Sequence, residues 1–111
     1  MVLELFEPAF DFTVRNERRP VMIAFVSDHC GFCQHLKPML AALSSQYDSK
    51  VATWMVNVDR APQLATLFAS EGVPVLVGFK AGDPVYRAVG LPPPDGLAGA
   101  YEDMSRLGQG A

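Results

Sequence analysis

Residues 21–33 read VMIAFVSDHCGFC, an apolar run that is followed almost at once by two cysteines three positions apart. The run from Val21 to Ser27 has the length of one β-strand, and its continuous apolar character is typical of a central strand covered on both faces. From Cys30 onward the apolar residues fall at helical spacing instead. The stretch therefore predicts a buried strand that leads directly into a helix, with Cys30-Gly31-Phe32-Cys33 at the junction.

The rest of the chain alternates between strand-like and helix-like segments. Apolar spacing and turn residues predict an edge strand over 2–5, a helix over 6–14 and a strand over 51–58. They also predict a helix with Pro62 in its first turn, a hairpin of strands 75–80 and 84–89, and a last helix that Asp95 caps and Gly108 ends. Strands joined through helices pair in parallel, and the hairpin adds antiparallel strands. The sequence therefore predicts an α/β fold with a central mixed β-sheet flanked by helices on both faces, in a single domain over 1–111.

The composition argues against several classes of protein. Half of the 111 residues are hydrophobic and 19% are charged, which argues against intrinsic disorder. The net charge of −3 provides no basic surface for nucleic acid or for an anionic membrane. The apolar runs are too short to span a bilayer, and the first residues lack the basic and apolar regions of a secretory signal. We therefore expect a cytoplasmic protein, or a periplasmic one if a signal peptide has been removed.

The cysteine pair is suited to redox chemistry rather than to stabilising the fold. Two cysteines three positions apart at the start of a helix bring their sulfurs within bonding distance, but a loop this short restricts the unfolded chain very little. The unpaired N–H groups and the positive dipole of a helix N-terminus stabilise a thiolate, which is the nucleophile of thiol–disulfide exchange. We expect Cys30, at the mouth of the helix, to attack, and Cys33, one turn further on, to resolve the mixed disulfide.

A metal site is the alternative interpretation of the two cysteines. His29 and His35 could complete a set of two cysteines and two histidines, but their spacing differs from the distant histidine pair that is usual in such zinc sites. Redox function is therefore favoured, and we expect that the protein needs no metal and no organic cofactor.

The chain resembles the thioredoxin family along nearly its whole length. The resemblance rests on the order and spacing of the segments Met22–Val26, His29–Cys33, Pro38, Val56–Asp59, Gly72–Pro74, Phe79–Asp83 and Gly90. Two cysteines at this spacing would be weak evidence alone, whereas the ordered set is specific. The resemblance implies a thioredoxin-like fold and thiol–disulfide oxidoreductase activity, with Cys30 and Cys33 as the catalytic residues.

The resemblance also implies a substrate-binding loop opposite the cysteines. In the family, the peptide bond before the proline that corresponds to Pro74 is cis, and the backbone of the preceding residue, here Val73, pairs with an extended substrate strand. Gly31, Phe32 and Gly90 are further candidates for an apolar surface that binds substrate. The implied partners are protein thiols or disulfides and a dithiol reductase that recycles the site, with the chain acting as a monomer.

Four positions depart from the typical thioredoxin pattern. Ala24 and Met55 occupy the positions of a buried aspartate and its lysine, so no buried carboxylate is expected to take the proton from Cys33. We therefore expect slower reductive turnover than that of a typical thioredoxin. Phe32 replaces the usual proline, as in bacterial disulfide isomerases and related Dsb-type proteins, and His29 replaces a tryptophan. These two changes predict a more oxidising couple than that of thioredoxin.

Two other functions remain open from the sequence. The chain could be a periplasmic disulfide oxidase or isomerase of the Dsb type, although a pure isomerase usually needs two sites that face one cleft, and the sequence has no obvious dimerisation segment. It could also be a non-enzymatic thioredoxin-fold module that serves as a chaperone or assembly partner. A Cys30→Ser variant distinguishes an enzyme from such a binding module, because the enzyme would lose its activity and the module would keep its function.

Overall fold

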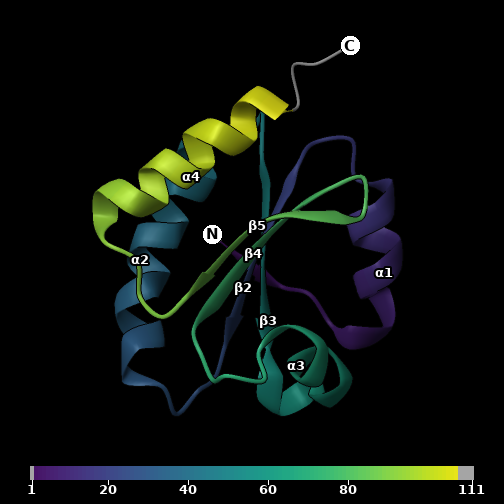
Figure 1. Ribbon diagram of the computed structural model, residues 1–111, viewed down its shortest axis with the longest axis vertical. Helices are drawn as coiled ribbons and strands as arrows, with labels where there is room; N and C mark the ends of the chain where they lie inside the picture. The colour runs from purple at the N-terminus through teal and green to yellow at the C-terminus, as the bar shows by residue number, and fades with distance from the viewer. Residues whose placement is uncertain (1, 108–111) are drawn as a thin grey trace.

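A mixed sheet of five strands forms the centre of residues 2–107, which are the residues that the computed structural model describes (Figure 1). The strands are β1 (Leu3–Glu4), β2 (Val21–Val26), β3 (Ala52–Asn57), β4 (Val75–Lys80) and β5 (Asp83–Val89). They lie in the order β1-β3-β2-β4-β5. The first three of that order run parallel, whereas β4 is antiparallel to β2 and β5 is antiparallel to β4.

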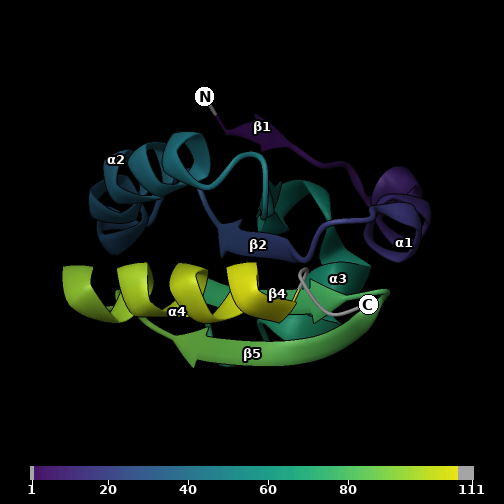
Figure 2. The same ribbon diagram turned by 90° about the horizontal axis from the view of Figure 1, so that it is seen from above.

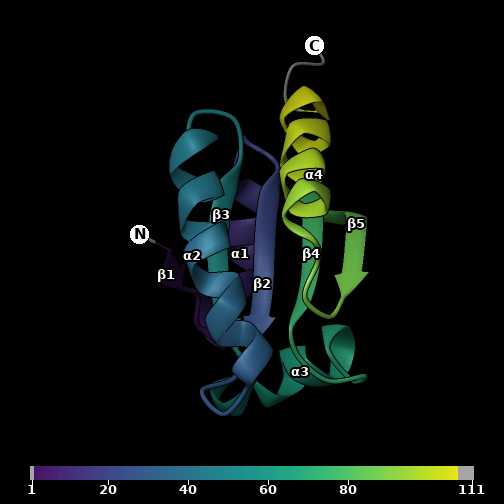
Figure 3. The same cartoon turned by 90° about the vertical axis from the view of Figure 1, so that its left-hand side faces the viewer.

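Helices cover both faces of this sheet. They are α1 (Glu7–Asn16), α2 (Gly31–Gln46), α3 (Pro62–Phe68) and α4 (Pro94–Leu107), and a short 3-10 helix, η1 (Val58–Arg60), follows β3. α2 and α4 lie side by side on one face, and α1 and α3 lie on the other (Figures 2 and 3). The predicted α/β class with helices on both faces is confirmed. Among the helices within residues 2–107, none has both the length and the apolar character needed to cross a membrane.

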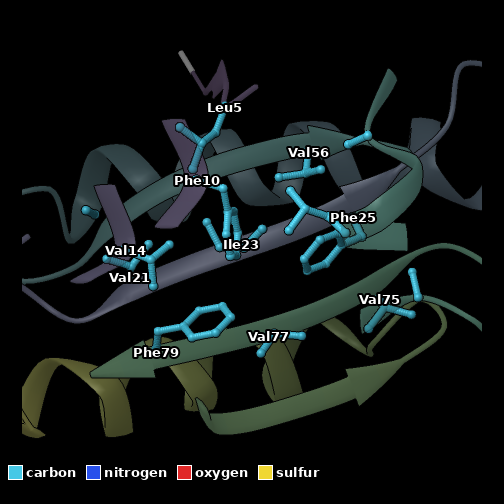
Figure 4. Packing of buried hydrophobic residues seen from close by; sticks show 14 residues of the cluster. Leu5, Phe10, Val14, Val21, Ile23, Phe25, Val56, Val75, Val77 and Phe79 are labelled. Atoms are coloured by element: carbon cyan, nitrogen blue, oxygen red, sulfur yellow. The ribbon is translucent and has the colours of Figure 1, made fainter. Parts of the chain in front are cut away.

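β2 connects the two halves of the core. All six of its residues are buried, because β3 and β4 flank it and helices cover both of its faces. Successive side chains of a strand point to opposite faces, so Ile23 and Phe25 pack in the cluster under α1 and α3 (Figure 4), while Met22 and Ala24 pack under α2 and α4. Burial of each large apolar side chain contributes about 1.5–3 kcal/mol. The loop that leaves β2 towards Cys30 therefore starts from a firmly held strand end.

A glycine in β4 allows α4 to approach the sheet closely. A Cβ atom at Gly78 would lie 2.5 Å from Sδ of Met104, which is fully buried on α4. Met104, Leu97 and Tyr101 pack from α4 into the same cluster as Cys33. The close packing of α4 thus helps to enclose the apolar space around the second cysteine.

The start of α4 differs from the sequence prediction. The expectation that Asp95 caps this helix is wrong, because α4 begins at Pro94 and Asp95 lies inside its first turn. The fixed φ of proline suits the first helical position, and the carbonyl oxygen of Pro93 accepts the Leu97 N–H at 3.0 Å. The Asp95 carboxylate still lies near the positive end of the helix dipole. The predicted stop at Gly108 lies outside the described residues.

Candidate active site

Cys30 lies in the loop between β2 and α2, at the N-terminal end of the helix. Its backbone is extended, and its Sγ accepts the Cys33 N–H at 3.1 Å, so the sulfur caps the helix. Cys30 is partly exposed and is present as a free thiol. A helix N-terminus presents unpaired N–H groups to this position.

Cys33 lies one helical turn further on, in a very different environment. It is fully buried among apolar side chains such as Ala24, Val26 and Leu36. This burial, together with a hydrogen bond to Cys30, raises the pKa of the Cys33 thiol to about 11, although the backbone N–H of Ser27 and the charge of Lys37 act in the opposite direction. Cys33 therefore carries its proton at neutral pH.

The loop that contains Pro74 faces Cys30. The Val73–Pro74 peptide bond is cis, as the family resemblance predicted. The Cys30 thiol donates to the Val73 carbonyl oxygen at 3.8 Å, and the Gly90 N–H donates to the Pro74 carbonyl oxygen at 2.8 Å. Gly90 has a φ of +87°, a left-handed conformation that glycine adopts without steric cost. The fold thus places Val73 beside the first cysteine and Gly90 beside Pro74.

Apolar side chains are exposed at the same end of the sheet. Gly31 and Phe32 form the first turn of α2, and 64% of Phe32 is exposed, although helical periodicity alone would place it in the core. Val89 and Leu91, which flank Gly90, are 53% and 37% exposed. Sequence reasoning did not select these two residues; the available signal was a pair of apolar residues around a glycine at the end of a predicted strand.

Two of the four positions that depart from the thioredoxin pattern pack in the same cluster as Cys33. Ala24 and Met55 are neighbours in the register of β2 and β3, and both pack in the cluster that contains Cys33. They supply no ionisable group to the buried sulfur. His29 is exposed, and its backbone N–H donates to Ser27 Oγ at 3.3 Å. In the described part of the chain, no three His, Cys, Asp or Glu side chains come together in a way that could hold a metal ion.

Comparison with known proteins identifies the arrangement. The family model named Thioredoxin matches residues 1–102. The chain belongs to the thioredoxin family. It is similar to the thioredoxin of Staphylococcus epidermidis, with 33% identity over 79% of this chain and 85% of that protein. It is also similar to the thioredoxin of Synechocystis sp., with 30% identity over 89% of this chain and 92% of that protein.

A larger protein also contains a segment similar to this chain. The bifunctional thioredoxin reductase/thioredoxin of Mycobacterium leprae is 28% identical over 95% of this chain, which corresponds to 22% of that protein. Family membership and the cysteine pair at a helix N-terminus make this chain a thioredoxin-type thiol–disulfide oxidoreductase, an enzyme of the protein disulfide reductase type.

Proposed function

We propose that Cys30 attacks disulfides of substrate proteins and that Cys33 resolves the product. The observation that supports these roles is the contrast between the two sulfurs. Cys30 is partly exposed, and its sulfur accepts the Cys33 N–H at the N-terminal end of α2. Cys33 is fully buried and keeps its proton at neutral pH. Thiol–disulfide exchange requires an accessible thiolate as the first nucleophile.

The reaction then proceeds in two exchange steps. In the first, the Cys30 thiolate forms a bond to one substrate sulfur, the substrate disulfide breaks, and the other substrate sulfur leaves as a thiolate that takes up a proton. In the second, Cys33 loses its proton and bonds to Cys30 Sγ, and the remaining substrate sulfur leaves and is protonated. The substrate gains two electrons, and the enzyme ends with a Cys30–Cys33 disulfide.

The surface around Cys30 supplies the proposed binding site. An extended substrate segment pairs with the backbone of Val73, next to Pro74, and replaces the contact that the Cys30 thiol makes with the Val73 carbonyl oxygen. Gly31, Phe32 and Gly90 provide apolar surface for the substrate side chains beside the disulfide. The exposure of Phe32 supports this placement, because a large apolar side chain in water gains from being covered by a partner.

A dithiol reductase returns the enzyme to its reduced form in this proposal. The Mycobacterium leprae relative, whose name combines a thioredoxin reductase with a thioredoxin, supports such a partner. We place the protein in the cytoplasm, where thiols are kept reduced, as a monomer whose residues 1–111 form one domain. The alternative is a periplasmic oxidase or isomerase. The exposed Phe32, which stands in place of the usual proline, favours this periplasmic function. A redox titration against glutathione distinguishes the reductase from the oxidase or isomerase, because the oxidase or isomerase should have the more oxidising midpoint potential.

A Cys33→Ser variant tests the assigned order of the two cysteines. Because the second exchange step is removed, we expect the variant to accumulate a mixed disulfide with a substrate such as insulin with its disulfides intact. The adduct should be visible on non-reducing gels and should be lost on addition of dithiothreitol. Peptide mapping of the adduct should place the substrate on Cys30. The double variant Cys30→Ser/Cys33→Ser is the matched control and should form no adduct. Failure of Cys33→Ser to form an adduct contradicts the proposed roles.

A further inference from the structure

An ion pair connects the loop between α3 and β4 to the edge strand β5. The guanidinium of Arg87, on β5, donates a hydrogen bond to the carboxylate of Glu71, and both side chains are about half exposed. Glu71 lies two residues before Val73, whose carbonyl oxygen contacts the Cys30 thiol at 3.8 Å. One pair of side chains therefore joins β5 to the segment that faces the first cysteine.

The backbone next to β5 holds the other end of the same loop. One residue past the end of β5, the Gly90 N–H donates to the Pro74 carbonyl oxygen at 2.8 Å, immediately before β4 begins. This bond continues the pairing of β4 with β5 and fixes the chain after Val73. Arg87 acts on the chain before Val73. The β5 end of the sheet thus contacts the loop on both sides of that residue.

The backbone around Val73 has few contacts of its own. The side chain of Val73 packs against the core clusters on both faces of the sheet, but its backbone N–H and carbonyl pair with no other backbone group within residues 2–107. A Cβ atom at Gly72 would have no atom within 4 Å beyond its neighbours in the chain. In the same described range, the segment 70–73 has a single backbone hydrogen bond, from the Gly72 N–H to the Ala69 carbonyl oxygen at 3.1 Å. Side-chain contacts therefore matter for holding this segment.

We propose that Glu71 and Arg87 are positioning residues for disulfide reduction: their ion pair holds the chain before Val73 so that the Val73 backbone is ready to pair with the substrate beside Cys30. The inference rests on the proposed function, because it assumes that an extended substrate segment pairs with Val73. A loop that is already held in its bound conformation loses less entropy on binding, so the pair strengthens substrate binding. It acts through Val73 rather than on the sulfur, so the reactivity of the Cys30 thiol does not depend on it.

Steady-state reduction of insulin, with dithiothreitol as the reductant, separates substrate binding from chemistry. Glu71→Gln and Arg87→Gln should each raise the KM for insulin by about two- to fivefold, a modest effect because an exposed ion pair contributes little. Each should change kcat by less than about twofold. Alkylation of Cys30 by iodoacetamide needs no pairing with Val73, so its rate should stay within about twofold of that of the wild-type protein.

Arg15→Gln is the matched control for the loss of an exposed ion pair. It removes the pair of Arg15 with Asp11 on α1, which is also exposed. Arg15 lies beside Gly82, in the turn that joins β4 and β5 at the end opposite to Val73. This variant should leave both the KM for insulin and the alkylation rate unchanged.

The direction of the changes separates positioning from long-range attraction of the substrate. Glu71→Gln removes a negative charge and Arg87→Gln a positive one, so long-range electrostatics would move KM in opposite directions. Positioning requires a rise in both, and the double variant Glu71→Gln/Arg87→Gln should be no worse than either single variant. The exchanged pair Glu71→Arg/Arg87→Glu should recover most of the wild-type KM.

The inference is overturned by an unchanged KM in both single variants, by changes of opposite sign, or by a rise in KM that the exchanged pair does not reduce. A fall in the alkylation rate of Cys30 that matches the loss of insulin reduction also overturns it, because the pair would then act on the thiol itself. Absence of insulin reduction by the wild-type protein contradicts the proposed function instead.

Discussion

Cys30→Ser is expected to lower the rate of disulfide reduction by roughly 10³-fold or more, because a serine hydroxyl is not ionised at neutral pH and cannot act as the first nucleophile. Cys33 cannot take over this role, since it is fully buried and protonated. The measurement is the reduction of insulin disulfides in the presence of dithiothreitol, compared with the rate without protein.

The fold of Cys30→Ser should be unaffected, which makes the loss of activity interpretable. Serine is among the preferred N-cap residues, and its hydroxyl oxygen can accept the Cys33 N–H that Cys30 Sγ accepts in the native protein. The midpoint of thermal unfolding should therefore lie within a few degrees of that of the reduced wild-type protein. A variant that keeps the native rate would contradict the enzymatic role of Cys30 and would favour a binding function for the thioredoxin fold.

Ala24→Asp is expected to destabilise the protein strongly at neutral pH. Position 24 is fully buried, and Met55 beside it provides no positive charge, so an ionised carboxylate there would cost about 3–5 kcal/mol. Burial raises the pKa of such a carboxyl group in the folded state above its unfolded value. The variant should therefore lose stability as the pH rises above about 4, and its deficit should be smaller at pH 4 than at pH 7.

The same substitution should accelerate the second exchange step. A carboxylate beside Cys33 can accept its proton, and general-base assistance typically contributes roughly 10²–10⁴-fold. In the native protein, the rate of the second exchange step should keep rising through the alkaline range, because burial holds the pKa of Cys33 well above neutral. In Ala24→Asp this increase in rate should occur at lower pH.

Two variants serve as controls for Ala24→Asp. Ala24→Asn has nearly the same shape without charge, so its loss of stability should not depend on pH and its second rate should not increase. Ala24→Asp/Met55→Lys should recover part of the stability, because positions 24 and 55 are neighbours in the register of β2 and β3. Denaturant unfolding at pH 4 and pH 7 measures the loss of stability in each variant and its dependence on pH. If Ala24→Asp and Ala24→Asn behave alike in both assays, the absence of a buried carboxylate does not limit this enzyme.

The parts of the fold that the sequence predicts are those encoded by neighbours along the chain. The change from a continuous apolar run to helical spacing at Cys30 locates β2, α2 and the cysteine pair, because strand and helix periods differ. The start of α4 was placed incorrectly because two chain features compete there: Asp95 is a good cap, but Pro94 is already suited to the first helical position.

The contacts around the site could not be predicted, because they join residues that are distant in the sequence. Ser27 and Asp59 are 32 positions apart, and their hydrogen bond depends on the parallel pairing of β2 with β3. The exposure of Phe32 depends on what covers the first turn of α2, which periodicity does not reveal. The need for a glycine at position 78 likewise appears only when Met104 of α4 is packed against it.

The most direct test of the account is the order in which the two thiols of the reduced wild-type protein react with a limiting amount of iodoacetamide at pH 7. Cys30 is partly exposed, whereas Cys33 is buried and retains its proton. Peptide mapping should therefore find the label on Cys30, with labelling of Cys33 slower by on the order of 100-fold. Labelling of Cys33 first, or no labelling of either thiol in the folded protein, would contradict the assignment of Cys30 as the attacking sulfur.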